Sequence, residues 1–286
     1  MTIKDKIRTK QYIIDPETNR ISFTDLRFYW DEFSNDFYPS VTTVLGMAWP
    51  KDHYFYEWLK ANGENADQIR DAAGTQGSIV HQATEVLDVG GRIAYLDDYN
   101  TPKYSTNEWK MIERYIDFKR RFKTQMKHIE VNLVSSTYKV GGTLDRVMYM
   151  EFKDKKKGSV IKRLLMDIKT SQNLHDQYWI QLSVYVKMWE ELYPNEKIDG
   201  ICILWLNAKT RTNGKEGDIQ GKGWQLVFPD EGIDDYFNDW LNVKAIFDRK
   251  FKDMKPNNLE YDLFFETKAE DQINLEELYE KQLVIA

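Results

Sequence analysis

The sequence predicts an α/β fold in which one central mixed β-sheet is flanked by helices. Two observations predict it. Some segments have apolar residues at three- and four-residue spacing, which is typical of helices. They alternate along the chain with short segments whose apolar residues alternate with polar ones or are continuous, which is typical of strands. The resulting order is helices, a strand hairpin, a helix, more strands and a last helix, which is typical of a sheet covered by helices. The length of 286 residues allows one large domain or two small ones, and we expect one domain with attachments.

The first attachment is predicted to be a β-hairpin. Two strand-like segments, residues 12–15 and 20–23, flank the turn-forming cluster Pro16-Glu-Thr-Asn19. The expected organisation is an N-terminal hairpin extension over 1–38, a main domain over 39–252 and a C-terminal tail over 253–286. In the tail, the acidic run at 276–280 is a candidate helix.

The main domain begins with segments that favour helices. Ser40 is a good N-cap for a short helix over the following residues, but three β-branched residues there favour a strand nearly as strongly. Residues 53–62 predict a helix rich in aromatic side chains that ends at Gly63. Residues 64–87 also have helical spacing, although Gly74 and Gly77 each cost a helix interior about 1 kcal/mol relative to alanine. Such glycines indicate either a break between two helices or a place where another backbone or a ligand comes close. These helices are the natural candidates for an arch over a substrate.

The rest of the main domain supplies the sheet and its covering helices. The strands at 138–150 and 160–169 form a second hairpin. The expected elements are a helix at 106–126, strands at 129–136, 138–150 and 160–169, a helix at 176–192, strands at 200–207 and 224–228 separated by a loop at 209–223, and a helix at 230–251.

Composition excludes several classes of protein. Apolar residues make up 42% of the chain and charged residues 30%, as in soluble globular proteins, and no apolar run is long enough to predict a secretory signal or a membrane span. A cytoplasmic location is therefore expected. The single cysteine, Cys202, excludes an internal disulfide and a cysteine-based metal site, and its apolar neighbours predict a buried side chain. The net charge of −6 decides little, because metal-binding carboxylates can make a nucleic-acid enzyme acidic.

The candidate catalytic residues are Asp145, Asp167 and Lys169. Asp145 ends the run Val140-Gly-Gly-Thr-Leu-Asp on one predicted strand, and Asp167 and Lys169 lie two residues apart on the next. Side chains alternate across a strand, so Asp167 and Lys169 share one face while Ile168 points to the core. Hydrolysis of a phosphodiester needs a cation and an activated water, which carboxylates and an ammonium group together provide. The competing interpretation is that the carboxylates only cap or close turns.

An Asp-x-Lys pair alone is a weak signal, because about one match is expected by chance in a chain of this length. Its surroundings are far more restrictive. The pair lies between the Gly-Gly-Thr-Leu-Asp145 strand and a predicted helix that carries Gln181 and Tyr185 one turn apart on the same face. The sequence therefore favours a metal-dependent hydrolase with the site at this junction.

These motifs resemble those of the RecB-like branch of the PD-(D/E)XK nucleases. The resemblance lies in Gly142-Thr-Leu-Asp145, Asp167-Ile-Lys-Thr-Ser171 and Gln181-Leu-Ser-Val-Tyr185, with Gly77-Ser-Ile-Val-His81 upstream and an opening segment at 39–45. The motifs occur in the family's order and cover roughly residues 39–189. The resemblance implies a restriction-endonuclease-like core and a metal-dependent DNA nuclease.

The resemblance also implies residue roles. His81, Asp145, Asp167 and the main-chain carbonyl of Ile168 would bind Mg²⁺ or Mn²⁺, and Lys169 would position the attacking water. Gln181 and Tyr185 would steady the site or touch DNA. Glu85, one helical turn after His81, would orient the imidazole.

The lone Cys202 marks a departure from the family members that hold an iron–sulfur cluster with four cysteines. A compact exonuclease of phage or mitochondrial type is the closer comparison. It implies a role in recombination, repair or replication, DNA with a free end as partner, no membrane partner, and the host cytoplasm for a phage-encoded chain. A structure-selective or restriction-like endonuclease, or a catalytically silent DNA-binding protein, remains the alternative, because one fold serves several functions. The sequence does not indicate an oligomeric state.

Further features have weaker interpretations. The basic runs at 119–123, 153–157 and 209–215 are candidate phosphate contacts or solvated surface. The tryptophans are explained by packing at core positions, among them Trp58, Trp109, Trp189 and Trp205. Three histidines match no motif: His53, His128 and His175.

Overall fold

A computed structural model describes residues 12–15, 19–24, 27–31, 33–154, 158–215 and 218–267. The chain divides into two compact units. The larger is Arg27–Lys255, and the smaller combines the two ends, Met1–Leu26 and Pro256–Ala286. The boundaries expected from the sequence were residues 38/39 and 252/253. The short hairpin of β3 (Phe28–Asp31) and β4 (Asp36–Pro39) thus belongs to the larger unit.

The smaller unit contains a three-stranded antiparallel sheet. Strands β1 (Tyr12–Asp15) and β2 (Arg20–Thr24) form the predicted hairpin, with Tyr12 opposite Phe23. Strand β11 (Asn258–Asp262) adds to β2 and was not expected within the tail. The sequence could not show this pairing, because it joins segments from opposite ends of the chain. The candidate helix at 276–280 lies outside the described residues.

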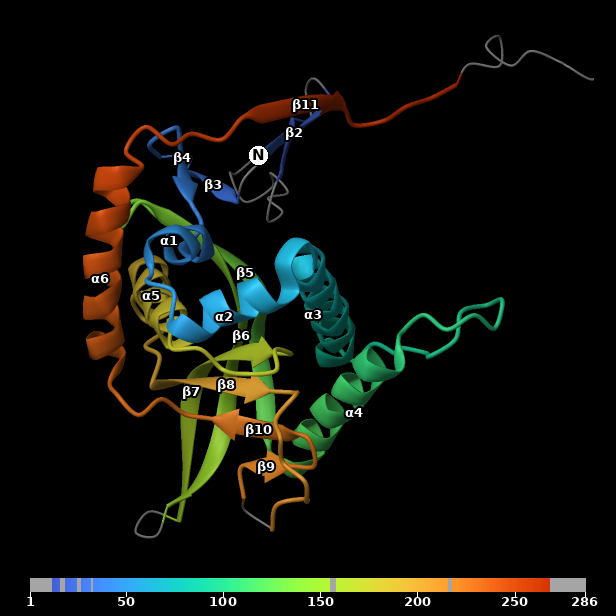
Figure 1. Cartoon of the computed structure of the whole chain (residues 1–286). Coiled ribbons are helices and arrows are strands. Elements are labelled where there is room, and N and C mark those ends of the chain that lie inside the picture. Colours follow the sequence, from blue (N-terminus) through green and yellow to red (C-terminus); the bar gives the residue numbers. More distant parts are fainter. Residues whose placement is uncertain are drawn as a thin grey trace, which may run out of the picture. The chain divides into compact units, whose positions relative to one another are not determined.

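The larger unit is built on a six-stranded sheet of order β5-β6-β7-β8-β10-β9. Its β7–β8 pair is parallel and the other pairs are antiparallel, so the sheet is mixed (Figure 1). The predicted α/β class with a central mixed sheet is confirmed. The strands are β5 (Thr124–Ser135), β6 (Val140–Asp154), β7 (Gly158–Lys169), β8 (Gly200–Trp205), β9 (Gln220–Gly221) and β10 (Trp224–Val227). Strand β9 was expected to be loop.

Helices cover both faces of this sheet. Helices α1 (Val41–Ala48), α5 (Gln177–Leu192) and α6 (Ile233–Lys250) pack on one face, and α3 (Ala66–Asp88) and α4 (Thr106–Arg121) on the other (Figure 1). The central strands alternate between the two resulting cores. Ile201 and Ile203 face the first, whereas Cys202 and Leu204 face the second. Cys202 is fully buried, as predicted.

The structure decides the open questions about the helices. Ser40 caps α1 by accepting a hydrogen bond from the Thr43 N–H at 2.9 Å, so the segment is a helix and not a strand. Helix α2 (His53–Asn62) is followed by Gly63 at φ +51°, as predicted. Helix α3 is continuous through both glycines. Helix α4 stops at Arg121, because β5 begins pairing with β6 at Thr124, so the predicted end at residue 126 is wrong.

Helix α2 differs from the other helices in having no buried side chain. Trp58 is 36% exposed and Tyr54 81% exposed, so the explanation of Trp58 by core packing is wrong. Trp189, in contrast, is fully buried, as packing predicted. Within the described residues, no helix combines the length and apolar character needed to cross a bilayer.

Candidate active site

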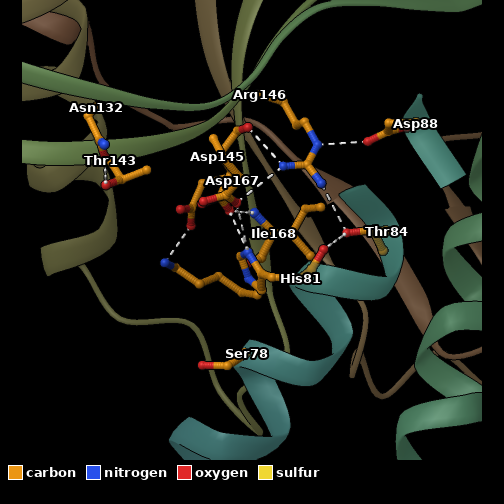
Figure 2. A network of polar contacts seen from close by, with 12 residues as sticks. Ser78, His81, Thr84, Asp88, Asn132, Thr143, Asp145, Arg146, Asp167 and Ile168 are labelled. Atoms are coloured by element: carbon orange, nitrogen blue, oxygen red, sulfur yellow. Dashed lines mark hydrogen bonds and ion pairs between the residues drawn. The ribbon is translucent and has the colours of Figure 1, made fainter. Parts of the chain in front are cut away.

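The candidate site lies where strands β6 and β7 separate. Their antiparallel pairing ends at Arg146 opposite Met166, while β7 continues beside β8 as far as Lys169 opposite Trp205. Beyond this fork, side chains and not a neighbouring strand contact the main-chain N–H and carbonyl oxygen of Ile168. Its N–H donates to Asp145 Oδ2 at 2.8 Å, and its carbonyl oxygen lies 2.9 Å from His81 Nε2 (Figure 2). The fork therefore joins β6, β7 and α3 at one point.

Asp167 and Lys169 share one face of β7, as the alternation predicted. Their side chains form an ion pair, with Lys169 Nζ 2.5 Å from Asp167 Oδ2, and Ile168 between them is fully buried. Lys169 Nζ also lies 4.5 Å from the centre of the Tyr178 ring on α5. The ammonium group is thus held at the fork by a carboxylate and an aromatic face.

Burial and neighbouring charges shift the pKa values of this pair. Burial raises the pKa of the Asp167 carboxyl to about 6, and the charge of Asp145 adds to this effect, although Lys169 opposes it. Burial works against the charged form of Lys169, but the carboxylates of Asp167 and Asp145 outweigh it and raise the pKa of the ammonium group. Lys169 is therefore a cation at neutral pH.

The imidazole of His81 faces acidic side chains. A carbonyl oxygen has no proton to give, so Nε2 must donate the hydrogen bond to Ile168. This leaves Nδ1 toward Asp145 Oδ2 at 3.4 Å and Glu130 Oε1 at 3.7 Å. Burial opposes protonation of the ring, but the negative charges of Asp145, Glu130 and Asp167 prevail and raise the pKa of His81. A lone pair facing two carboxylates is unfavourable, so this point requires a cation, either a proton on Nδ1 or a metal ion.

Glu130 is the site residue that sequence reasoning missed. It lies on β5, and its carboxylate comes within 4.8 Å of ligand atoms of His81 and Asp145, an arrangement able to hold a metal ion. Its backbone has φ +49°, a left-handed conformation that is unusual for a non-glycine residue and costs free energy. No motif marks Glu130, because strand pairing brings it beside Asp145. Glu130 lies next to the imidazole of His81. From the sequence, Glu85 was expected to lie there and orient the ring.

A fully buried arginine links this cluster to the helices. Arg146, next to Asp145 on β6, donates to Asp88 Oδ2 at 2.7 Å and to Thr84 Oγ1 at 3.1 Å (Figure 2). It also donates to Glu130 Oε1 at 3.3 Å. Burial opposes its charged form, but the hydrogen bond and charge of Asp88 raise the pKa of Arg146. The guanidinium group therefore ties α3 and β5 to β6 and supplies one positive charge beneath the carboxylates.

Asp88 itself has two further partners, both on α4. The hydroxyl of Tyr115 donates to Asp88 Oδ1 at 2.5 Å, and Lys119 Nζ lies 3.1 Å from the same oxygen. Burial, together with the charge of Asp88, raises the pKa of Tyr115. The end of α3 is thus fixed to α4 as well as to the sheet.

Gln181 and Tyr185 support the strand that carries Asp145. Both are nearly buried on α5, and Gln181 Nε2 donates to the Tyr185 hydroxyl at 3.0 Å. The Tyr185 ring lies against Gly142, where a Cβ would stand 2.3 Å from Cε1. On β3, Tyr29 packs on Gly141 in the same way and bonds Thr143 at 2.9 Å through its hydroxyl. The Gly-Gly pair therefore lets two aromatic rings hold β6 just before Asp145.

The two glycines of α3 have different explanations. A Cβ on Gly77 would lie 3.3 Å from Thr170 Oγ1, so this glycine allows the loop after Lys169 to approach the helix. A Cβ on Gly74 would meet no atom within 4 Å. Close approach of the Thr170 side chain thus accounts for Gly77, and no such contact accounts for Gly74.

The basic runs have mixed surroundings. Lys119 is paired with Asp88, and Lys123 lies 3.2 Å from Glu151, which makes part of the first run structural. Lys153 lies eight residues along β6 from Asp145, about 26 Å for an extended strand. The second run is therefore far from the fork, and its residues 155–157 lie outside the described part of the chain. The third run stays a candidate phosphate contact.

No protein-family model matches the chain, and a search of curated proteins finds no match.

Proposed function

We propose that the protein is a metal-dependent DNA nuclease of the PD-(D/E)XK type, related to the RecB-like exonucleases, acting in DNA recombination, repair or replication. One observation carries the proposal. Asp145, Asp167 and Lys169 come from two strands that separate at this point, and they meet there with the imidazole of His81. Turn-capping carboxylates would not need a lysine and a histidine brought from separate elements.

The donor set fits Mg²⁺ or Mn²⁺. Carboxylates of Asp145 and Glu130 and the imidazole of His81 gather within 4.8 Å, and oxygen ligands with one imidazole suit these ions. Asp167 Oδ2 is buried and, apart from its ion pair with Lys169, accepts no directed hydrogen bond in the described part of the structure. The carbonyl oxygen of Ile168 has a second lone pair beside the one that His81 uses. These groups would hold the ion.

A bound divalent ion lowers the pKa of a coordinated water and neutralises charge that develops on a phosphate. The protein's own groups supply positioning and charge. The carboxylates of Asp167 and Asp145 raise the pKa of Lys169, which favours its ammonium form, and this group would donate hydrogen bonds to the attacking water or to a phosphate oxygen. Asp145 is fixed by the N–H of Ile168, which aligns its carboxylate with the edge of β7.

The catalytic assignment is tested with purified protein, DNA and Mg²⁺ or Mn²⁺. Asp167→Asn and Lys169→Met should each lower the hydrolysis rate by at least about 100-fold while the far-ultraviolet circular dichroism stays that of the parent. The matched control is Asp234→Asn, since Asp234 is an exposed carboxylate that pairs with Lys187 far from the fork. Parental activity in either site variant would overturn the assignment. Absence of hydrolysis in the parent with both metals would leave the silent DNA-binding alternative.

The mode of attack is tested by topology of the substrate. An exonuclease should degrade linear single- or double-stranded DNA to 5′-phosphorylated products and leave closed circles intact. Cleavage of circles at a comparable rate would replace the exonuclease proposal by the endonuclease alternative. Running both substrates in one tube with distinguishable labels removes differences in enzyme concentration.

A further inference from the structure

A cavity lies beside the fork. It has a volume of about 520 Å³ and is formed by α3, α4, the loop that follows Lys169, and Asn207 after β8. This volume lies in the range of small-molecule sites in proteins. The residues of the loop that line it, Thr170 to Gln172, follow directly on Lys169, so the cavity adjoins the candidate active site.

The lining of this cavity is basic and amide-rich. Lys110 and Arg114 stand one turn apart on α4, and Asn107 and Met111 complete that face of the helix. Among the described residues, no aspartate or glutamate lines the cavity, although acidic residues outnumber basic ones in the whole chain by 46 to 40. The local charge is therefore opposite in sign to the net charge.

In the part of the chain that the structure describes, neither Lys110 nor Arg114 has a carboxylate within ion-pairing distance. Arg114 donates one hydrogen bond, to the carbonyl oxygen of Leu206 at 2.7 Å, which fixes the guanidinium group at the cavity. Its Nε and Nη2 lie against Gly223 and make no hydrogen bond within the described residues. An arginine held in this way favours an anion with several acceptor oxygens, and a phosphate is the common one.

Gly74 leaves the backbone of α3 bare at the cavity. It lines the cavity, and a Cβ there would meet only open space, so protein packing does not require a glycine in this helix interior. Gly74, Gly77 and His81 recur at three- and four-residue spacing, which places them on one face of α3. Gly74 is about 10 Å from His81 along that face. A ligand that passes from the fork to the cavity would meet the bare backbone at Gly74.

We propose that this cavity binds a phosphate-bearing nucleotide of the substrate strand adjacent to the one cleaved at the fork. Lys110 and Arg114 contact the phosphate, and the amides of Asn107 and Asn207 contact the sugar or base. This inference rests on the proposed nuclease function, because it takes the strand at the fork to be nucleic acid. The two cations that would bind the phosphate, Lys110 and Arg114, lie outside all of the sequence motifs.

The test measures binding without turnover. A single-stranded oligothymidylate of about 20 nucleotides, labelled at its 3′ end, is titrated in EDTA and followed by fluorescence anisotropy. Gly74→Leu should fill the cavity, weaken binding at least about 10-fold and keep or raise the thermal midpoint, since it removes a helix-interior glycine. Lys110→Ala should weaken binding several-fold and reduce the slope of log K against log salt by about 0.7, the value for one lost phosphate contact.

Matched controls stand outside the cavity. Gly46→Leu makes the same change on α1, at another glycine with open space around its Cβ, and Lys250→Ala removes a positive charge at the end of α6. Both should bind as the parent does. Oligonucleotides with a 5′-phosphate or a 5′-hydroxyl separate two sources of the phosphate. If the cavity variants bind only the 5′-phosphate oligonucleotide more weakly, the cavity binds the phosphate at the strand end. If they bind both oligonucleotides equally more weakly, the cavity binds an internal phosphate.

Parental binding and an unchanged salt slope in both Gly74→Leu and Lys110→Ala would overturn the inference. If these variants and the parent hydrolyse DNA equally well with Mg²⁺, the cavity assignment alone has failed. If the parent neither binds the oligonucleotide nor hydrolyses DNA or RNA with either metal, the proposed function fails together with it.

Discussion

The ring of Tyr185 on α5 occupies the space that a side chain at Gly142 on β6 would need, because a Cβ there would stand 2.3 Å from Cε1 of the ring. The contact lies three residues before Asp145 along the strand. It fixes the distance between β6 and α5. The position from which Asp145 accepts the hydrogen bond of the Ile168 N–H depends on this distance.

Gly142→Ala should be strongly destabilising, because the buried ring cannot move away without disturbing the core. Overpacking of this kind costs about 1–3 kcal/mol of the free energy of unfolding, measured by denaturant titration. Adding Tyr185→Leu to Gly142→Ala should recover part of the loss, as expected for residues in contact. Gly46→Ala is the control and should leave stability unchanged or raise it, since its Cβ meets open space. Equal effects at Gly142 and Gly46 would contradict the packing argument.

Arg146→Met should lower the free energy of unfolding by about 3–5 kcal/mol, because it removes the guanidinium partner of the Asp88 carboxylate, and the side chain of Asp88 is fully buried. The matched control is Lys119→Met, which removes a partner of the same carboxylate. Lys119 is 27% exposed, so its removal should cost no more than about 1 kcal/mol. A denaturant titration of both variants checks the prediction, and similar losses in the two would show that burial of the pair is not decisive.

Glu130→Gln should weaken Mn²⁺ binding at least about 10-fold, because it removes one negative charge from the three-residue cluster. Isothermal titration calorimetry with Mn²⁺ alone, without DNA, measures this directly. Glu196→Gln is the control, because it neutralises a carboxylate that pairs with Lys127 on the same strand but is not part of the cluster, and it should bind as the parent does. Unaltered Mn²⁺ affinity in Glu130→Gln would remove Glu130 from the metal ligands and leave it the role of orienting His81.

His128 should make the protein less stable as the solution becomes acidic. Burial against α5 lowers the pKa of His128; the charge of Glu196 opposes this effect, and the positive charges of Lys127 and Arg163 add to it. The unfolded chain therefore takes up this proton first as pH falls. The contribution of neutral His128 is complete above its unfolded pKa of about 6.5 and is lost as pH falls from there toward the lower folded-state pKa.

The measurement is the thermal midpoint at about pH 7.5 and about pH 5.5. His128→Phe keeps a ring beside Trp189, whose centre lies 5.0 Å from that of the imidazole, but cannot titrate. It should show a smaller fall in midpoint than the parent. His53→Gln, at an exposed position on α2, should fall as much as the parent. An identical fall in His128→Phe would mean that other groups account for the acid sensitivity.

The sequence alone determined the class of fold and the pair of strands that carries Asp145, Asp167 and Lys169. Alternation along β7 placed Asp167 and Lys169 on one face and Ile168 in the core, because side chains of a strand alternate whatever the strand pairs with. Helix propensity and the Ser40 cap located most helices, since both depend on neighbours within one turn. Local rules failed at the end of α4, where tertiary strand pairing overrode the helical pattern from Thr124 onward.

Only the tertiary structure decided what surrounds that pair. Glu130 and Arg146 reach the site through strand register, and the charge-compensating Asp88 comes from the end of α3, more than fifty residues earlier in the chain. The cavity at Gly74 likewise depends on how α3 lies against α4. Spacing within a segment cannot predict such neighbours, because they are set by which strands pair and which helices pack, and those choices depend on the whole hydrophobic core.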